Sequence, residues 1–371
     1  MSELFGIKKK LGFGCMRLPM QGDMVDTAEF CRMVDIFLEN GFNYFDTARG
    51  YLGGKSETAL RECLTSRYPR ERYVLTNKLS HNFFKTTADI RPYFESQLAA
   101  CGVEYFDIYL MHAQNRNIYA RYKRERAYET ALELLAEGKI KHFGISFHDK
   151  AEVLREILTE YPQIEVVQLQ FNYLDYEDPS VEGRKCYEVC RELGKPVFVM
   201  EPVKGGRLAN QLPPEAEEIF RAVGTGSNAS FAIRFAAGFE GIVSVLSGMG
   251  TCEMVLDNVS YMKDFQPLDG KEMQAVERVT ALLCAQDLIP CTACKYCMEV
   301  CPKGIAVPDI LGAVNSMKVC NSWNAKHYYD IFTENAPKAS DCIACGKCEG
   351  SCPQQLPIRQ LLKEAVTLFE K

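Results

Sequence analysis

The segment AYETALELLAEGKIKHFGIS, from Ala127 to Ser146, contains one complete unit of the pattern that decides the fold. Its first half has apolar residues three and four positions apart, which is the spacing of one helix face, and Gly138 ends that helix. Its second half, IKHFGIS, is rich in β-branched and aromatic residues and predicts a strand. A helix that leads directly into a strand is the repeating unit of α/β proteins.

The same alternation extends over most of the chain. Eight strand candidates follow one another: GFGCMRL, NYFDTA, YVLTNK, YFDIYLMH, IKHFGIS, EVVQLQF, PVFVME and IVSVLS. Most are apolar along their whole length, as strands buried on both faces should be. Eight strands, each followed by a helix, predict an α/β fold of the (β/α)8 TIM barrel type. An open doubly wound sheet is the alternative, but no GxGxxG turn follows the first strand.

The alternation stops near residue 284, where we expect a domain boundary. Residues 1–284 form the predicted barrel, and residues 285–371 form a predicted small, mainly helical domain. The helical candidates in this second part are VPDILGAVNSM and PIRQLLKEAVTLFE. Its acidic and basic residues balance, so neither composition nor charge indicates a flexible tail.

Two cysteine runs in the second part share the pattern C-x2-C-x2-C-x3-C-P. They are CTACKYCMEVCP, which begins at Cys291, and CIACGKCEGSCP, which begins at Cys342. In proteins with two [4Fe–4S] clusters and this pattern, the fourth cysteine of each run binds the other cluster. We therefore expect one cluster on Cys291, Cys294, Cys297 and Cys352, and a second on Cys342, Cys345, Cys348 and Cys301. Structural zinc is the alternative, but it prefers two C-x2-C pairs per site. The stretch resembles bacterial-type ferredoxins.

Overall composition limits the classes of partner. The net charge of −6 gives no bulk basic surface for nucleic acid. No apolar run approaches the ~20 residues of a membrane span. The N-terminal stretch MSELFGIKKKLGFG has no signal-peptide core. We expect a cytoplasmic protein that binds neither nucleic acid nor membrane.

Polar residues at the ends of consecutive strands suggest a catalytic site. Asp46 lies near the end of NYFDTA, Lys78 ends YVLTNK and His112 ends YFDIYLMH, while Tyr51 lies in the loop after Asp46. Polar groups at the carboxyl ends of barrel strands usually carry the chemistry. A neighbouring ammonium favours the phenolate form of a tyrosine, and a carboxylate holds the lysine charged. The set predicts a general acid for a carbonyl oxygen that gains negative charge.

The segments FDTARGYLGGKSE, LTNK and LMH resemble the aldo-keto reductases, and the resemblance covers roughly residues 5 to 265. It implies that Tyr51 is the proton donor, that Lys78 lowers the pKa of Tyr51 and that Asp46 pairs with Lys78. It also implies that His112 orients the substrate carbonyl and that a nicotinamide supplies hydride.

The resemblance further implies a nucleotide site. Ser146 and Gln168 correspond to residues that hold the carboxamide, and Asp257 and Asn258 correspond to a pair that contacts adenine. Met200 stands where the family usually stacks an aromatic residue on the nicotinamide. The loops after strands seven and eight often bind phosphates in barrels, so we expect contacts from Lys204, Gly205, Gly206, Ser247 and Gly248. The basic residues that NADPH-selective members use after strand eight are absent, so NADH and NADPH both remain candidates.

The two parts of the chain suggest two candidate functions. The first is a nicotinamide-dependent oxidoreductase that acts on a carbonyl or alcohol and carries clusters for electron transfer or regulation. The alternative is an electron-transfer protein in which the clusters supply a redox partner protein and the barrel is a scaffold. Hydride transfer moves two electrons and a [4Fe–4S] cluster moves one, and the sequence contains no flavin signature that would connect them.

Overall fold

The computed structural model describes residues 4–179, 181–224, 226–286, 288–320 and 323–370. The chain forms two compact units. The first comprises Met1–Val203 with Leu212–Val276, and the second comprises Lys204–Gln211 with Glu277–Lys371. The boundary expected after residue 284 stays a prediction. Over the described part of the chain, no helix is both long and apolar enough to cross a membrane.

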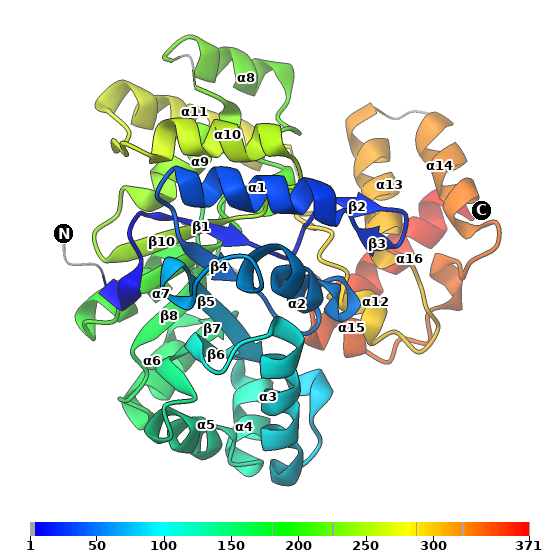
Figure 1. Cartoon of the computed structure of the whole chain (residues 1–371). Helices are drawn as coiled ribbons and strands as arrows, with labels where there is room; N and C mark the ends of the chain where they lie inside the picture. Colours follow the sequence, from blue (N-terminus) through cyan, green and yellow to red (C-terminus); the bar gives the residue numbers. More distant parts are fainter. Residues whose placement is uncertain (1–3, 180, 225, 287, 321–322, 371) are drawn as a thin grey trace. The chain divides into compact units, whose positions relative to one another are not determined.

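The first unit contains a closed barrel of parallel strands in the order β1-β10-β9-β8-β7-β6-β5-β4 (Figure 1). The strands are β1 (Leu11–Gly14), β4 (Tyr44–Asp46), β5 (Val74–Leu79), β6 (Phe106–Gln114), β7 (Ile140–Phe147), β8 (Val166–Gln170), β9 (Val197–Met200) and β10 (Ile242–Ser247). Each predicted strand overlaps one of them, so the predicted (β/α)8 barrel is confirmed. The separate hairpin β2 (Met20–Gln21) and β3 (Met24–Val25) was not predicted, because its two-residue strands are too short to show a period.

Helices occupy the connections between the strands and follow the last strand, β10. They are α1 (Thr27–Glu39), α2 (Lys55–Leu60), α3 (Thr87–Cys101), α4 (Arg116–Arg124), α5 (Ala127–Ala136), α6 (Ala151–Glu160), α7 (Gly183–Glu192), α8 (Pro214–Arg221), α9 (Asn228–Ala237), α10 (Cys252–Met262) and α11 (Gly270–Cys284). Shorter helical turns include η2 (Tyr51–Gly54), η6 (Lys204–Gly206) and η7 (Ala339–Asp341).

Apolar strands and close backbone packing hold the barrel together. Every residue of β5 and of β8 is buried, which explains why these strands are not alternating in the sequence. Gly144 in β7 pairs with Val166 in β8, and a Cβ atom on Gly144 would lie 2.5 Å from the Val166 carbonyl oxygen. Only glycine therefore allows the backbones of β7 and β8 to approach in this register.

The first helix shows how local signals and packing agree. The Asp26 side chain accepts a hydrogen bond from the backbone N–H of Glu29 at 3.0 Å, which caps the start of α1. Phe37 on α1 contacts Phe13 of β1 edge to face, with ring centroids 5.4 Å apart. The cap and this aromatic contact fix α1 on the outside of the barrel.

The second unit is mainly helical. It contains α12 (Tyr296–Glu299), α13 (Val307–Cys320), α14 (Trp323–Thr333), α15 (Lys347–Gly350) and α16 (Ile358–Phe369). Its apolar core includes Ile310, Leu311, Val314 and Leu362, and six of the eight cysteines of the two runs belong to that core or pack against it. The rings of Tyr329 on α14 and Phe369 on α16 stack at 4.7 Å. Helix α14 was not predicted, because its sequence is rich in polar and aromatic residues with modest helix propensity.

We predict that Gly144→Ala destabilises the barrel by about 1–3 kcal/mol, because a Cβ atom would overpack a contact with a backbone oxygen that cannot rotate away. Urea unfolding of the full-length protein measures this change. The control is Gly270→Ala, since a Cβ atom at Gly270 meets nothing within 4 Å. Equal stability of the two variants would contradict the packing argument.

Candidate active site and metal centres

Lys78 is the centre of the predicted catalytic group. Its Nζ donates to Asp46 Oδ1 at 2.5 Å and to the Thr47 carbonyl oxygen at 2.9 Å, and it lies 3.2 Å from the Tyr51 hydroxyl oxygen. Lys78 is fully buried, and Asp46 and Tyr51 are 3% and 9% exposed. Strands β4 and β5 are parallel neighbours, and their register brings Lys78 beside the end of β4. The structure therefore brings the predicted carboxylate, ammonium and phenol together.

Lys78 is buried away from water and lies beside the Asp46 carboxylate. Burial lowers the pKa of Lys78, and the Asp46 carboxylate opposes that shift. The second carboxylate oxygen of Asp46 accepts a hydrogen bond from Gln168 Nε2 at 3.1 Å. Both oxygens of Asp46 are thus engaged, so the carboxylate holds one orientation beside the ammonium.

His112 lies near Tyr51. The two rings are 6.2 Å apart and nearly perpendicular. His112 Nδ1 lies 2.6 Å from Ser80 Oγ. Burial lowers the pKa of His112 well below its ordinary value, and the nearby Lys78 charge adds to the shift. His112 is therefore neutral near pH 7.

Two residues near this histidine were not predicted from the sequence. Ser80 lies just after β5 and fixes the His112 ring. Burial, followed by the Lys78 charge, lowers the pKa of His148 to about 4. His148 lies two residues after Ser146 at the end of β7, and its place in GISFH at a strand end was the signal that could have revealed it.

A buried polar network supports the backbone of Lys78. Gln97 Nε2 donates to the Lys78 carbonyl oxygen at 3.1 Å, and Asn77 Oδ1 accepts from the Lys78 N–H at 2.8 Å. Glu57 Oε1 accepts from both amide side chains, and Tyr109 donates to Gln97 Oε1 at 2.6 Å. The network orients the strand end that carries the ammonium, and sequence spacing alone gives no signal for it.

The predicted nucleotide residues of the first unit lie at strand ends or follow them. Ser146 Oγ accepts from the Ala113 N–H at 2.8 Å, which leaves its own hydroxyl hydrogen available to donate to a carboxamide. Asn258 Nδ2 donates to Ser247 Oγ at 2.6 Å, so these two predicted contacts touch each other. Asp257 accepts from Ser227 Oγ at 2.7 Å. Met200 ends β9 and is partly buried.

Gly248 follows Ser247 in the loop after β10. A Cβ atom on Gly248 would lie 3.7 Å from the Arg17 side chain, so this loop has a cation beside it. Arg17 also lies 3.8 Å from Glu201. Together with the Ser146 and Gln168 contacts, this donor set fits a nicotinamide nucleotide, whose carboxamide needs hydrogen bonds and whose phosphates are anionic.

Lys204, Gly205 and Gly206 differ from the other predicted nucleotide residues because they belong to the second compact unit. Lys204 is 3% exposed, and its Nζ donates to Gln354 Oε1 at 3.0 Å. The Lys204 ammonium group therefore has a hydrogen-bond acceptor within the cysteine-rich unit.

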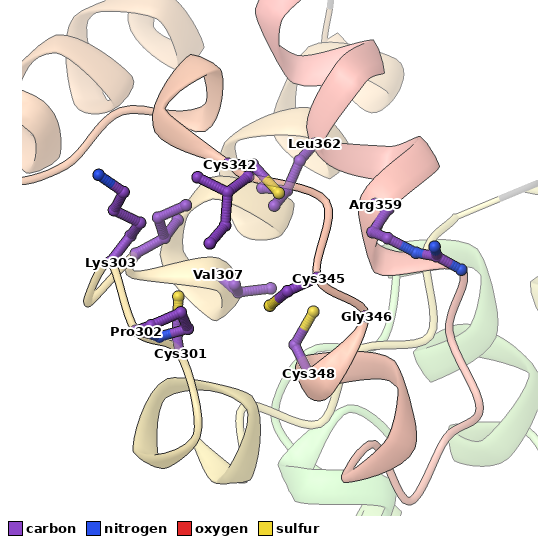
Figure 2. Close-up of a pocket in the computed structure, with 12 residues that line it drawn as sticks. Cys301, Pro302, Lys303, Val307, Cys342, Cys345, Gly346, Cys348, Arg359 and Leu362 are labelled. Carbon is purple, nitrogen blue, oxygen red and sulfur yellow. The ribbon is translucent and has the colours of Figure 1, made fainter.

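One predicted cysteine group surrounds a cavity. Cys301, Cys342, Cys345 and Cys348 line the same pocket, together with apolar residues such as Ile305. Figure 2 shows these cysteines around one space, contributed by the segment before α13, the segment before α15 and α15 itself. The group includes the fourth cysteine of the first run and the first three of the second run, as the sequence predicted.

The other predicted group converges on Cys297. Burial raises the pKa of the Cys297 thiol, and the nearby thiols of Cys294, Cys291, Cys352 and Cys348 add to the shift. The backbone N–H groups of Leu356, Gln354 and Gln355 donate to the Cys352 thiol. Backbone donors around a sulfur ligand are typical of iron–sulfur sites.

The two cysteine runs also share an unusual backbone conformation. Ala293 and Lys295 have φ values of 53° and 67°, and the equivalent Ala344 and Gly346 have values of 54° and 76°. Non-glycine residues rarely adopt positive φ, and such strain often marks functional sites. The repeated conformation wraps three cysteines of each run around one point, which fits a cluster.

Within the described residues, no three His, Cys, Asp or Glu side chains are arranged to hold a single metal ion.

Comparisons with known proteins agree with both units. The aldo/keto reductase family matches residues 10–281, and the 4Fe-4S dicluster domain family matches residues 290–356. An aldo-keto reductase from Klebsiella pneumoniae in complex with NADPH has a similar structure, with a TM-score of 0.60 and 19% identity over 74% of this chain and 95% of that one. An aldo-keto reductase from Bacillus halodurans, in its holo form, has a TM-score of 0.58 and 24% identity over 73% of this chain and 91% of that one. These two likenesses concern the fold.

Curated relatives are similar over shorter stretches. The NADH-specific methylglyoxal reductase of Escherichia coli is 28% identical over 48% of this chain, and the match spans 59% of that relative. A norsolorinic acid reductase of Emericella nidulans is 28% identical over 36% of this chain and 37% of that relative. The family match covers most of the sequence and the cysteine runs match a second family, so the protein belongs to the aldo/keto reductase family and carries a C-terminal 4Fe–4S ferredoxin-type domain.

Proposed function

We propose that the barrel interconverts a carbonyl and an alcohol with NADH or NADPH, and that Tyr51 is the general acid and base. The observation that carries this proposal is the buried Lys78 ammonium, which lies 3.2 Å from the Tyr51 hydroxyl oxygen and 2.5 Å from Asp46. A phenol ordinarily holds its proton tightly near neutral pH. A cation beside the hydroxyl stabilises the phenolate that forms after proton transfer.

The proposed roles follow from charge. In carbonyl reduction the oxygen gains negative charge, and Tyr51 donates a proton to that oxygen. The nicotinamide supplies the hydride when it is bound. Lys78 stabilises the resulting phenolate, and Asp46 keeps Lys78 charged and in place. In alcohol oxidation the same groups act in reverse.

His112 suits the role of a neutral hydrogen-bond donor. We propose that its Nδ1 accepts from the Ser80 hydroxyl, so that Nε2 carries the proton and donates to the substrate oxygen. A neutral imidazole can orient a carbonyl without adding a second full charge beside Lys78.

The nucleotide contacts proposed for the barrel are Ser146 and Gln168 at the carboxamide, Met200 at the nicotinamide ring, Ser247 and Gly248 at the phosphates, and Asp257 and Asn258 at the adenine. The 2.6 Å contact between Asn258 and Ser247 supports a common binding surface. One curated relative is named NADH-specific, and one similar structure holds NADPH, so both nucleotides are candidates for this chain.

We further propose that the second unit binds two [4Fe–4S] clusters. Cys291, Cys294, Cys297 and Cys352 would hold the first cluster, and Cys301, Cys342, Cys345 and Cys348 would hold the second. The clusters supply one-electron transfer when they are bound. The exposed position of Cys345 favours electron exchange between the second cluster and a redox partner protein. If the barrel proves to be a scaffold, electron transfer alone is the alternative function. The cytoplasmic location and the lack of nucleic-acid and membrane binding stay predictions.

Replacing Tyr51 by Phe should reduce carbonyl reduction by about 10²- to 10⁴-fold, because the proton donor is lost. Steady-state oxidation of NADH and NADPH with a panel of aldehydes, methylglyoxal included, measures this loss. Nucleotide affinity should stay unchanged. Tyr187→Phe is the control, since the hydroxyl of Tyr187 only donates to the Glu240 carbonyl oxygen on the surface. Retained turnover in Tyr51→Phe would overturn the proposed mechanism.

In the proposed assignment, each cluster takes three cysteines from one run and the fourth cysteine of the other run. This assignment predicts which cysteine variants lose the same cluster. Cys352→Ala and Cys291→Ala should lose the same cluster, and Cys301→Ala and Cys342→Ala should lose the other. Each variant should keep roughly half of the iron, and EPR of the reduced protein should show one remaining signal for each pair. The exposed Cys284 provides a control outside the pattern, and Cys284→Ala should keep all the iron. If Cys352→Ala lost the same cluster as Cys342→Ala, the result would contradict this assignment.

Two partly buried histidines predict that acid destabilises the folded protein. Burial lowers the pKa of His81 and of His148 to about 4. Between pH 6.5 and 4 the unfolded chain therefore binds more protons at these sites, so the free energy of unfolding falls as the pH falls. Each histidine contributes at most ~1.4 kcal/mol per pH unit in this window.

The variant His148→Asn should make this decline shallower than in the wild type. Urea unfolding at several pH values between 6.5 and 5 compares the slopes, and the comparison cancels any effect of acid on the clusters. Identical slopes for wild type and His148→Asn would show that His148 is not held neutral by the fold.

A further inference from the structure

Two cysteines outside the cysteine runs lie on neighbouring helices of the first unit. Cys31 lies on α1, and Cys63 lies on the π-helical turn η3 (Arg61–Thr65), which directly continues α2. Cys63 is fully buried, whereas Cys31 is partly exposed. Both are free cysteines, and the proposed chemistry of the barrel uses neither of them.

The two thiols face each other. They lie within hydrogen-bond reach, and burial together with the neighbouring Cys31 thiol raises the pKa of Cys63. The Cys63 thiol also donates to the Thr27 carbonyl oxygen at 3.3 Å. Thr27 lies one helical turn before Cys31 on α1, so the Cys63 sulfur packs on the side of that helix that carries Cys31.

One arginine holds the two backbones side by side. Arg67 Nη1 donates to the Cys31 carbonyl oxygen at 3.4 Å and to the Cys63 carbonyl oxygen at 3.1 Å. These two oxygens can therefore be no farther apart than the sum of the two distances. Arg67 Nη2 also donates to Asp35 Oδ2 at 2.9 Å, which anchors the guanidinium on α1. The arrangement is compatible with a disulfide, whose Cα atoms lie within about 7 Å of each other.

The helix that carries Cys63 is irregular at this point. The Ser66 N–H donates to the Arg61 carbonyl oxygen at 3.1 Å, a bond that spans five residues instead of the four of an α-helix. Such π-turns are rare, and they occur frequently at functional sites. Turn η3 packs on α1, so the irregular turn contributes Cys63 to the contact with Cys31.

We propose that Cys31 and Cys63 form a reversible disulfide, a two-electron redox site that is separate from the cluster cysteines. The oxidant is a small disulfide such as oxidised glutathione. The Cys31 sulfur, which solvent reaches, attacks one sulfur of the small disulfide, and the other sulfur leaves as a thiol with the Cys31 proton. The Cys63 sulfur then attacks the Cys31 sulfur, and the second small thiol leaves with the Cys63 proton. Two S–H bonds are lost, one S–S bond forms, and the small disulfide is reduced to two thiols.

The disulfide would close a loop around the segment that carries two residues of the proposed catalytic group. Asp46 and Tyr51 lie between Cys31 and Cys63 along the chain. A crosslink of this kind stabilises the folded state mainly by restricting the unfolded chain. The thiols already face each other, so we expect the linked protein to keep its barrel and to unfold at a higher urea concentration. The inference requires neither a bound nucleotide nor a cluster, so it stands apart from the proposed function.

The first measurement maps the linkage in the full-length protein with its clusters. The protein is incubated anaerobically with oxidised glutathione, the remaining thiols are blocked by alkylation, and tryptic peptides are identified by mass spectrometry. Trypsin releases Cys31 in the peptide of residues 18–32 and Cys63 in the peptide of residues 62–67, and each peptide contains a single cysteine. We expect these two peptides to be linked, and excess dithiothreitol should separate them.

Single variants separate the roles of the two thiols. In Cys63→Ala, Cys31 should keep one glutathione as a mixed disulfide, because no second thiol displaces it. In Cys31→Ser, Cys63 should stay a thiol, because it is buried and no partner passes the oxidant to it. Cys186 and Cys190 are both buried on α7, so they are the internal control and should stay thiols.

Urea unfolding measures the effect of the crosslink. The midpoint of wild type should rise after treatment with oxidised glutathione, and the midpoint of Cys31→Ser should not change. Absence of the linked peptides at every ratio of oxidised to reduced glutathione would overturn the inference. Equal oxidation of Cys186 and Cys190 would also overturn it, because contact would then not select the pair. If Cys63→Ala fails to fold, wild type and Cys31→Ser still decide the question.

Discussion

A charged lysine inside a protein needs polar partners, and the barrel chemistry depends on how Lys78 obtains them. Asp46, the Thr47 carbonyl and the Tyr51 hydroxyl all lie within hydrogen-bond distance of its Nζ. These partners come from the end of β4 and the loop after it, while Lys78 comes from β5. The parallel pairing of β4 with β5 is what brings them to one place. These contacts offset the cost of burying the Lys78 ammonium. They also put a cation beside the Tyr51 phenol, so the contacts that stabilise the site also favour its chemistry.

The cysteine-rich unit has a small apolar core, and its cysteines contribute to the packing. About a hundred residues surround a small apolar core, and six of the eight cysteines of the two runs belong to it or pack directly against it. The crossed arrangement, in which Cys301 joins the cysteines of the second run, ties distant parts of this segment together. Clusters in these positions would add to the free energy of folding, because their ligands come from both ends of the unit. The turn Lys204–Gly206 extends this unit into the connection after strand β9.

Much of this organisation could be predicted from the sequence, because its signals are local. Apolar runs such as VVQLQ predict buried strands, and the C-x2-C-x2-C-x3-C-P runs give the cysteine groups. Contacts that depend on tertiary packing gave no such signal. Ser80 beside His112 and the network of Glu57, Asn77 and Gln97 behind Lys78 are separated along the chain. Lys204 was predicted from its place after a strand, and its bond to Gln354 spans 150 residues that no local pattern connects.

The central claim is that the barrel transfers hydride directly while Tyr51 moves the proton. The most direct test uses NADH and NADPH that carry deuterium on the transferable position of nicotinamide C4, with methylglyoxal as the carbonyl probe and intact clusters. Mass spectrometry of the product shows whether the new C–H bond contains deuterium. Direct transfer predicts one deuterium in each product molecule. A product whose new hydrogen comes from water would contradict the account, because electrons would then reach the substrate by another route.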